Sequence, residues 1–380
     1  MSIHKSGGLL SSPNLRSLSH VNGALGTSAL ASLVSLLLLL VPGSKGFAQR
    51  RELVVPQTYE AFFADSEIVI DGKGDEQGWE KTPFSDKFID IEGEITPQFE
   101  TRMKMLWDEH YLYFYAEMEE PHVWGTLKQR DTVIFYNNDF EIFIDPDGDT
   151  HEYYEFEMNA LNTVWDLLLV KPYRNGGSVL DHWNINGLKT AVHIDGSLND
   201  ASDEDRGWSV EIAMPWDVLS EASHMPVPPE GKFWRVNFSR VNWDHDLKDG
   251  RYSRKKDEDG NFAPEYNWVW SAQQVVNMHE PERWGYVYFK PQGEVSTFEI
   301  PEAEVVKWRL YAIYRELIRD NGSLTEQIRQ GKSKLPALWV DGSEVAVAIE
   351  FHHGGWNLVA TDPSGQGVHM IQNDGKYRFK

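Results

Sequence analysis

The acidic segment around residue 145 carries the densest set of side chains that could do chemistry. Asp145, Asp147 and Asp149 alternate around Pro146 and Gly148 in a turn-forming sequence. Closely spaced carboxylate oxygens are the ligands that Ca²⁺ prefers, although the bidentate Glu at the twelfth place of an EF-hand loop is missing here. The segment therefore predicts a structural Ca²⁺ site, and a polar β-turn without metal is the alternative.

Two glutamates lie in strand-like segments on either side of this turn. Glu141 belongs to the segment 139–144 and Glu157 to the segment 153–159. Burying a carboxylate without a partner costs several kcal/mol, so such side chains are rarely found inside a protein. We therefore expect both glutamates to face either solvent or a polar groove.

Other reactive side chains form no recognisable catalytic set. The Asp-His-Asp sequence at 244–246 and the basic cluster at 251–256 lie on one predicted long loop, and His352 and His353 lie in a turn. Such a histidine pair is predicted to be solvated rather than bound to metal. No Ser/His/Asp spacing, phosphate-binding loop or dinucleotide fingerprint occurs in the sequence. With 59 acidic residues, carboxylate pairs suited to glycoside hydrolysis arise too easily to be diagnostic.

The composition restricts the possible partners. A net charge of −23 repels nucleic-acid phosphates and anionic membranes, so we expect no nucleic acid partner. Neutral sugars and divalent cations remain compatible with this charge. The absence of cysteine excludes disulfides, thiolate nucleophiles and attachment through a lipidated cysteine. The 15 Trp residues are more than a core of this size usually needs, which indicates aromatic surfaces for ligand stacking.

The first 48 residues are predicted to be a secretory signal peptide. An apolar, uncharged run at 25–41 follows Lys5 and Arg16, and small residues at the −3 and −1 places predict cleavage between Ala48 and Gln49. An uncleaved membrane anchor is the alternative, because the run is at the lower limit of spanning length. We expect an exported protein, periplasmic or secreted, with no membrane contact after cleavage.

Short strand-like runs separated by Gly, Asp, Asn and Pro clusters fill residues 67–290. The run 208–215 alternates apolar and polar residues until a proline ends it, whereas 111–117 is apolar on both faces, as in a central strand. Helical periodicity over ten or more residues is absent from this region. The pattern predicts an all-β, jelly-roll-like β-sandwich, preceded by a lead-in over 49–66.

The pattern changes after Pro301. Residues 302–320 fit an amphipathic helix that ends at Asn321-Gly322, and three strand-like runs joined by turn sequences follow. Residues 301–380 are therefore predicted to form a small α+β appendage, in which no chemistry is evident.

Five motifs in the region 68–290 follow one another in an order that resembles the family 9 carbohydrate-binding modules. They are Ile70-Asp71-Gly72 with Trp79, Leu106-Trp107-Asp108 with Tyr111-Leu112-Tyr113, Asp139-Phe140-Glu141-Ile142-Phe143-Ile144-Asp145, Trp208-Ser209-Val210-Glu211-Ile212-Ala213-Met214-Pro215-Trp216, and Trp284-Gly285. The resemblance implies a β-sandwich that holds a sugar between two aromatic rings, with polar side chains on the sugar hydroxyls and structural Ca²⁺ elsewhere.

The resemblance also implies which residues hold the sugar. It places one stacking ring just before the strand that contains Glu141 and the other near residue 268. The candidates are Phe135 or Tyr136 on one side, with Trp124 as the nearest tryptophan, and Trp268 or Trp270 on the other. The expected hydroxyl partners are Glu141, Asn159 and Asn267. This chain departs from the family pattern because its first stacking residue is Phe or Tyr.

Three hypotheses on function follow. The first is an exported carbohydrate-binding protein that serves polysaccharide catabolism, the second a glycan-processing hydrolase with an unrecognised site, and the third an interaction module that keeps the fold without the sugar site. Exposed aromatics along a cleft would favour the first, and carboxylates roughly 5–10 Å apart in that cleft the second. Burial of Tyr136, Trp268 and Trp270 would favour the third.

Overall fold

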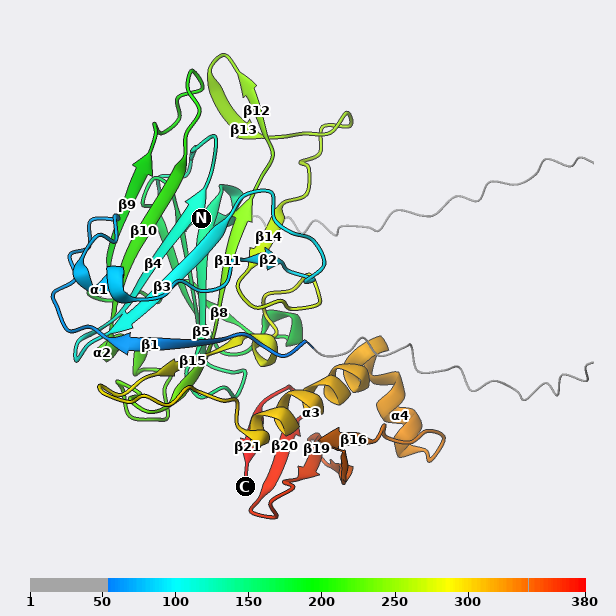
Figure 1. Ribbon diagram of the computed structural model, residues 1–380. Coiled ribbons are helices and arrows are strands. Elements are labelled where there is room, and N and C mark those ends of the chain that lie inside the picture. Colours follow the sequence, from blue (N-terminus) through cyan, green and yellow to red (C-terminus); the bar gives the residue numbers. More distant parts are fainter. Residues whose placement is uncertain (1–53, 341) are drawn as a thin grey trace, which may run out of the picture. The chain divides into compact units, whose positions relative to one another are not determined.

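The computed structural model describes residues 54–340 and 342–380, so the predicted signal peptide lies outside the described residues. The sandwich region contains fifteen strands and two short helices (Figure 1). The strands are β1 (Thr58–Phe63), β2 (Ile89–Asp90), β3 (Thr101–Trp107), β4 (Tyr111–Glu119), β5 (Asp139–Asp145), β6 (Tyr153–Asn159), β7 (Val164–Leu169), β8 (Val179–Leu180), β9 (Lys189–Asp195), β10 (Gly207–Pro215), β11 (Phe233–Asn242), β12 (His245–Lys248), β13 (Arg251–Arg254), β14 (Tyr266–Val269) and β15 (Gly285–Phe289). The helices are α1 (Gln77–Lys81) and α2 (Trp216–Leu219).

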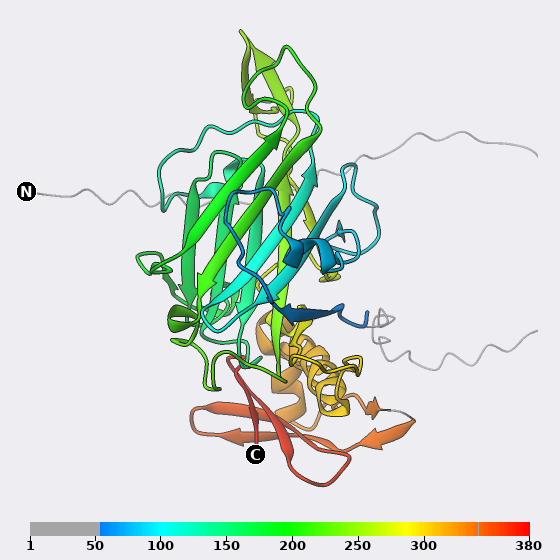
Figure 2. The same cartoon turned by 60° about the vertical axis from the view of Figure 1, so that its left-hand side comes forward.

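The strands form two facing layers, as predicted for an all-β sandwich (Figure 2). One layer has the order β8-β7-β6-β5-β11-β15 and the other the order β3-β4-β10-β9. Strand β1 joins them, because residues 58–61 pair with β15 and residues 62–63 pair with β3, both in parallel. Strand β14 pairs with β11, and β2 pairs with β14. The short hairpin β12–β13 forms a separate sheet.

Strand β1 lies within the segment 49–66, which the sequence indicated to be only a lead-in. Tyr59 and Ala61 of this strand are buried, at 6% and 0% exposure, while Glu60 between them is more exposed. This short alternation is too brief to stand out in the sequence, and the strand becomes evident only through its two parallel neighbours. The other proposed domain boundaries stay predictions.

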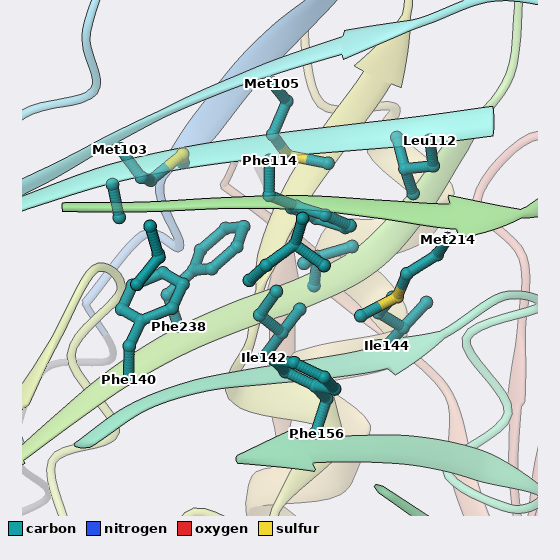
Figure 3. Packing of buried hydrophobic residues seen from close by; sticks show 14 of the residues in the cluster. Met103, Met105, Leu112, Phe114, Phe140, Ile142, Ile144, Phe156, Met214 and Phe238 are labelled. Carbon is teal, nitrogen blue, oxygen red and sulfur yellow. The ribbon is translucent and has the colours of Figure 1, made fainter. Parts of the chain in front are cut away.

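The core lies between the two layers and follows the two-residue period of the strands. Phe140, Ile142 and Ile144 of β5 point from one layer toward Met103 and Phe114 of the other (Figure 3). Because successive side chains of a strand point to opposite faces, the remaining residues of β5 and β6 must lie on the outer face of their layer. That outer face contains acidic residues, and its geometry determines the candidate site.

Glu211 on β10 connects two of the sequence motifs. Its Oε2 accepts hydrogen bonds from the backbone N–H groups of Asp71 (2.8 Å) and Gly72 (2.6 Å), and its Oε1 accepts one from Trp79 Nε1 (2.8 Å). Gly72 has φ = +91°, and a Cβ at this position would lie 2.6 Å from the backbone nitrogen of His193. Only glycine fits such a close approach with positive φ. The first and fourth motifs are thus parts of one structural anchor.

Residues 301–380 form a helical and β-sheet unit, as the sequence predicted. It contains α3 (Glu302–Ile318), α4 (Ser323–Arg329), the hairpin β16 (Leu338–Val340) and β17 (Ser343–Val345), and the sheet β18 (Val347–His352), β19 (Gly355–Thr361), β20 (Val368–Gln372) and β21 (Tyr377–Phe379). The buried residues of α3 pack against one face of the antiparallel sheet β18–β21 and give this unit its own core. Within residues 54–340 and 342–380, no helix is long and apolar enough to span a membrane.

Candidate functional site

A groove lies on the outer face of the layer that contains β5, β6, β7, β11 and β14. Its volume is about 290 Å³. Carboxylates and aromatic rings from segments distant in the sequence meet in it. The lining residues are Ile91, Phe135, Glu141, Phe143, Glu155, Glu157, Trp165, Leu167, Tyr173, Arg174, Val179, Val241, Glu265, Asn267, Val276, Asn277, Met278 and His279.

Three glutamates contributed by two neighbouring strands line this groove. Glu141 of β5 is directly opposite Glu157 of β6, and Glu155 is two residues earlier on the same face of β6. All three are buried, with exposures of 5%, 2% and 6% respectively. The sequence left open whether Glu141 and Glu157 face solvent or a polar groove, and the structure places both in the groove.

Burial changes the protonation of these carboxyl groups. It raises the pKa of Glu141 to about 7, and the negative charge of Glu265 adds to the rise. Burial, followed by the charge of Glu141, also raises the pKa values of Glu155 and Glu157 well above their usual range. Near neutral pH the groove therefore contains protonated as well as ionised carboxyl groups. Such a surface can both donate and accept hydrogen bonds.

Aromatic side chains line the same groove. Phe135 and Trp165 are partly exposed there, and Tyr173 is 45% exposed. Trp165 lies opposite Glu157 in the β6–β7 register, and its indole Nε1 is buried without a hydrogen-bond partner. An indole N–H without a partner can donate to an acceptor on a ligand.

His279 links the glutamates to the aromatic side chains. Its Nδ1 lies 2.8 Å from the Tyr153 hydroxyl and its Nε2 lies 3.8 Å from Glu155, while its ring is 4.2 Å from that of Tyr173. Burial, together with the nearby Arg174, lowers the pKa of His279 to about 3. The imidazole is therefore neutral at physiological pH, and Arg174 is the cationic side chain in the groove lining.

Three predicted site residues, Phe135, Glu141 and Asn267, do lie in the groove. Among the described residues, the Asn267 side chain forms no hydrogen bond, so its amide is available to a ligand. Tyr136 is 44% exposed but does not line the groove; its ring packs on Phe135 and carries the Arg254 guanidinium 4.4 Å from its centroid.

The predicted second stacking ring was wrong, because Trp268 and Trp270 are only 3% and 2% exposed. Trp268 stacks on Tyr266, and the Arg240 guanidinium lies 5.0 Å from its ring. Trp270 packs so closely on Gly285 that a side chain at that glycine would overlap the indole. Both rings thus belong to the core cluster, and neither can present a face to a sugar.

Two further predictions are corrected by the structure. Trp124 is 2% exposed because it stacks on Tyr252 at a centroid distance of 6.3 Å, which leaves no ring face for a ligand. Asn159 is fully buried, and its amide closes the β6–β7 turn. It donates to Leu127 O (2.9 Å) and accepts from the backbone N–H groups of Leu161 and Thr163. Its hydrogen-bonding capacity is therefore used within the protein.

The sequence interpretation missed Glu155, Trp165, Tyr173 and His279 as groove residues. Strand alternation could have placed Glu155 and Glu157 on one face, since they are two residues apart. Trp165 lies on β7, and its place beside Glu157 depends on the β6–β7 register. Tyr173 and His279 had no local signal, because the loops after β7 and β14 bring them to the groove.

The carboxylates of Asp145 and Asp149, in the acidic loop after β5, already have hydrogen-bond or ion-pair partners within the protein. Asp145 accepts hydrogen bonds from the N–H groups of Gly148 and Thr150, and Asp149 accepts one from His151 and pairs with Lys376 Nζ at 3.0 Å. Oxygens of Asp145, Asp147 and Asp149 do lie within 4.8 Å of one another, which is compatible with a metal ion. However, Lys376 already supplies positive charge, so Ca²⁺ at this loop stays a prediction.

The sandwich region of the chain matches the model of a known protein family. The model of the family described as carbohydrate family 9 binding domain-like matches residues 70–291. A family 9 carbohydrate-binding module from Caldicellulosiruptor kristjanssonii in complex with cellotriose is similar with 15% sequence identity and a TM-score of 0.42, over 64% of this chain and 100% of that one. A structure of such a module from that organism in complex with glucose is similar with 16% sequence identity and a TM-score of 0.40. The match covers 63% of this chain and 100% of that one. No curated protein matches the chain.

Proposed function

This chain belongs to the carbohydrate family 9 binding domain-like family, and from that membership and the groove on the outer face we propose that it binds a saccharide there. The observation that carries this proposal is the combination of partly exposed aromatic rings with buried carboxyl groups in one groove. Sugar rings have apolar C–H faces that pack on aromatic rings, and hydroxyls that need directional donors and acceptors. Phe135 and Trp165 supply ring surface, and Glu141 and Asn267 supply polar contacts.

The size and charge of the groove restrict the ligand class. A volume of about 290 Å³ is at the lower end for small-molecule sites, which favours a single sugar or the end of a glycan over a long internal segment. Four of the lining residues are glutamates and one is an arginine, so uronic or sulfated sugars would meet repulsion. We expect a neutral glycan.

The test is a glycan array on the purified protein, followed by titration calorimetry with the best ligand. Trp165→Ala should weaken binding at least tenfold, about 1.4 kcal/mol, since ring surface and an indole donor are lost together. Trp339→Ala is the matched control, because Trp339 lies on β16 outside the groove and is 51% exposed. The control should bind like the wild type.

Each outcome has a distinct meaning. If Trp165→Ala binds as tightly as the wild type, the saccharide does not occupy this groove. If the wild type binds none of the plant, algal and bacterial glycans on the array, the interaction-module hypothesis replaces the proposal. Shortened glycan products after incubation would instead favour a hydrolase.

We also propose that the protein is exported and takes part in polysaccharide catabolism. The apolar run 25–41 and the small residues before Gln49 support export through a signal peptide. The intact mass of the protein recovered from the periplasm or medium of its host should correspond to a chain that begins at Gln49. Retention of the full chain in the membrane fraction would contradict this proposal.

A further inference from the structure

Three carboxylates on β5 and β6, two of which line the groove, are grouped closely enough to share a metal ion. Asp139 and Glu141 lie on the same face of β5, and Glu157 is opposite Glu141 on β6. One oxygen from each residue lies within 4.8 Å of the other two. The side chains are 0%, 5% and 2% exposed, so the arrangement is built into the sheet and is not a feature of mobile surface side chains.

The structure provides little to compensate three negative charges here. Glu157 accepts a hydrogen bond from Phe135 N at 3.0 Å, and Asp139 Oδ1 accepts one from Val241 N at 3.3 Å. Within residues 54–340 and 342–380, no lysine, arginine or histidine forms an ion pair with any of the three. Three carboxylates held this close together without a cationic partner are the arrangement that a bound cation would stabilise.

Two buried polar atoms at this position have no partner and point to a missing ligand. Asp139 Oδ2 accepts no hydrogen bond although the residue is fully buried. The Ser239 hydroxyl, from β11 directly opposite Glu141, is also fully buried without a partner. It is close enough to lower the pKa of Glu141 in part, but it does not reach hydrogen-bond geometry. Buried polar atoms without partners are rare in native proteins and require an explanation.

We propose that Asp139, Glu141 and Glu157 bind a Ca²⁺ ion. The donors are all oxygens, which disfavours Zn²⁺ and other ions that prefer nitrogen or sulfur. The three oxygens lie within 4.8 Å of one another, and Ca²⁺ accepts irregular oxygen shells of this kind, whereas Mg²⁺ demands near-ideal octahedral geometry. Ca²⁺ needs six to eight ligands, and the groove has room for waters or ligand hydroxyls to complete the shell.

This site is different from the aspartate loop in which the sequence predicted Ca²⁺. In that loop, Asp145 is saturated by backbone N–H groups and Asp149 is paired with Lys376. The trio on β5 and β6 has neither a lysine nor a comparable set of backbone donors. Ca²⁺ binding by the trio also does not depend on saccharide binding, so the two proposals can fail separately.

The experiment is titration calorimetry of the full chain with CaCl₂ after removal of metal with a chelator. The wild type should show a binding event that is absent, or at least tenfold weaker, in Asp139→Asn and in Glu141→Gln. Both substitutions keep the shape of the side chain and remove its charge. Asp147→Asn, in the aspartate loop, is the matched control and should retain this event.

Thermal unfolding gives a second readout that separates lost binding from lost folding. In chelator, Asp139→Asn should melt at or above the wild-type temperature, because it removes repulsion. On addition of Ca²⁺ the melting temperature of the wild type should rise, and that of the variant should not. The proposal is overturned if millimolar Ca²⁺ produces neither heat nor a melting shift in the wild type, or if both groove variants bind Ca²⁺ as the wild type does.

Discussion

At the scale of the residue, Glu211 shows how one buried carboxylate can hold distant segments together. It is fully buried and accepts hydrogen bonds from two backbone N–H groups and one indole N–H. Each of these donors would be left without a partner if the carboxylate were removed. An unsatisfied buried donor costs about 1–3 kcal/mol, so the three together represent a large share of the stability of a domain.

Glu211→Ala should therefore lower the free energy of unfolding by about 3 kcal/mol or more, as measured by urea denaturation. Glu100→Ala is the control, because its ion pair with Lys87 is exposed on both sides, at 59% and 62%. An exposed pair contributes about 0–1 kcal/mol. Equal losses in the two variants would show that the Glu211 hydrogen bonds do not stabilise the fold.

The tryptophans illustrate how one residue type serves two purposes. Trp268 and Trp270 are nearly fully buried in the core, whereas Trp165 remains partly exposed in the groove with its N–H unpaired. Their chemistry is the same, so composition alone could not assign which tryptophans fill the core and which remain exposed. Packing partners such as Gly285 decide which ring is covered.

At the scale of the element, the two-residue period of β5 and β6 generates both the core and the site. The apolar residues of each strand enter the sandwich, and the acidic residues between them lie on the outer face. Antiparallel pairing then places Glu141 beside Glu157. A one-residue shift of register would exchange the two faces, so burial of the apolar set also fixes the position of the carboxylates.

The loops determine several of the groove-lining side chains, which the strand pattern does not predict. Phe135 precedes β5, Tyr173 follows β7 and His279 follows β14, yet all three line the same groove. Loop residues carry no periodic signal, and their positions follow from the whole sheet rather than from neighbours in the sequence. For this reason the sequence located the groove strands but not most of the groove lining.

At the scale of the whole molecule, a buried ion pair connects α3 to the sandwich. Arg315 donates to both oxygens of Glu282, from Nε at 2.6 Å and from a terminal nitrogen at 3.0 Å. Glu282 is 4% exposed. Burial alone would raise the pKa of Glu282, but Arg315 and Arg283 outweigh it and hold the pKa below its ordinary value of 4.5.

Glu282→Gln should lower the free energy of unfolding by about 3 kcal/mol at pH 7, because it leaves Arg315 buried without its main partner. A depressed folded-state pKa contributes stability that is present above the unfolded pKa and lost as pH falls through the folded pKa. The difference in the free energy of unfolding between the wild type and Glu282→Gln, measured by chemical denaturation, should thus be largest at pH 7. It should decrease as the pH falls below 4.5.

Glu316→Gln is the matched control on the same helix, since its pair with Arg319 is more exposed, at 31% and 57%. This control should change stability by less than about 1 kcal/mol at either pH. If Glu282→Gln unfolds at the wild-type denaturant concentration at pH 7, the pair contributes nothing to the stability of the chain.

The sequence by itself determined the features that depend on local pattern. Alternation and turn residues predicted the β-sandwich and the helix after Pro301. The resemblance carried by the five motifs named Phe135, Glu141 and Asn267, which line the groove. These features are encoded by neighbours within a few residues, where backbone geometry imposes a fixed period.

Only the tertiary structure decided which side chains are available to a ligand. Trp268, Trp270, Trp124 and Asn159 are covered or saturated by residues far away in the chain, and Trp165 is not. The strand period assigns a residue to a face, but exposure depends on what packs against that face. That information arises only when both layers and their loops come together.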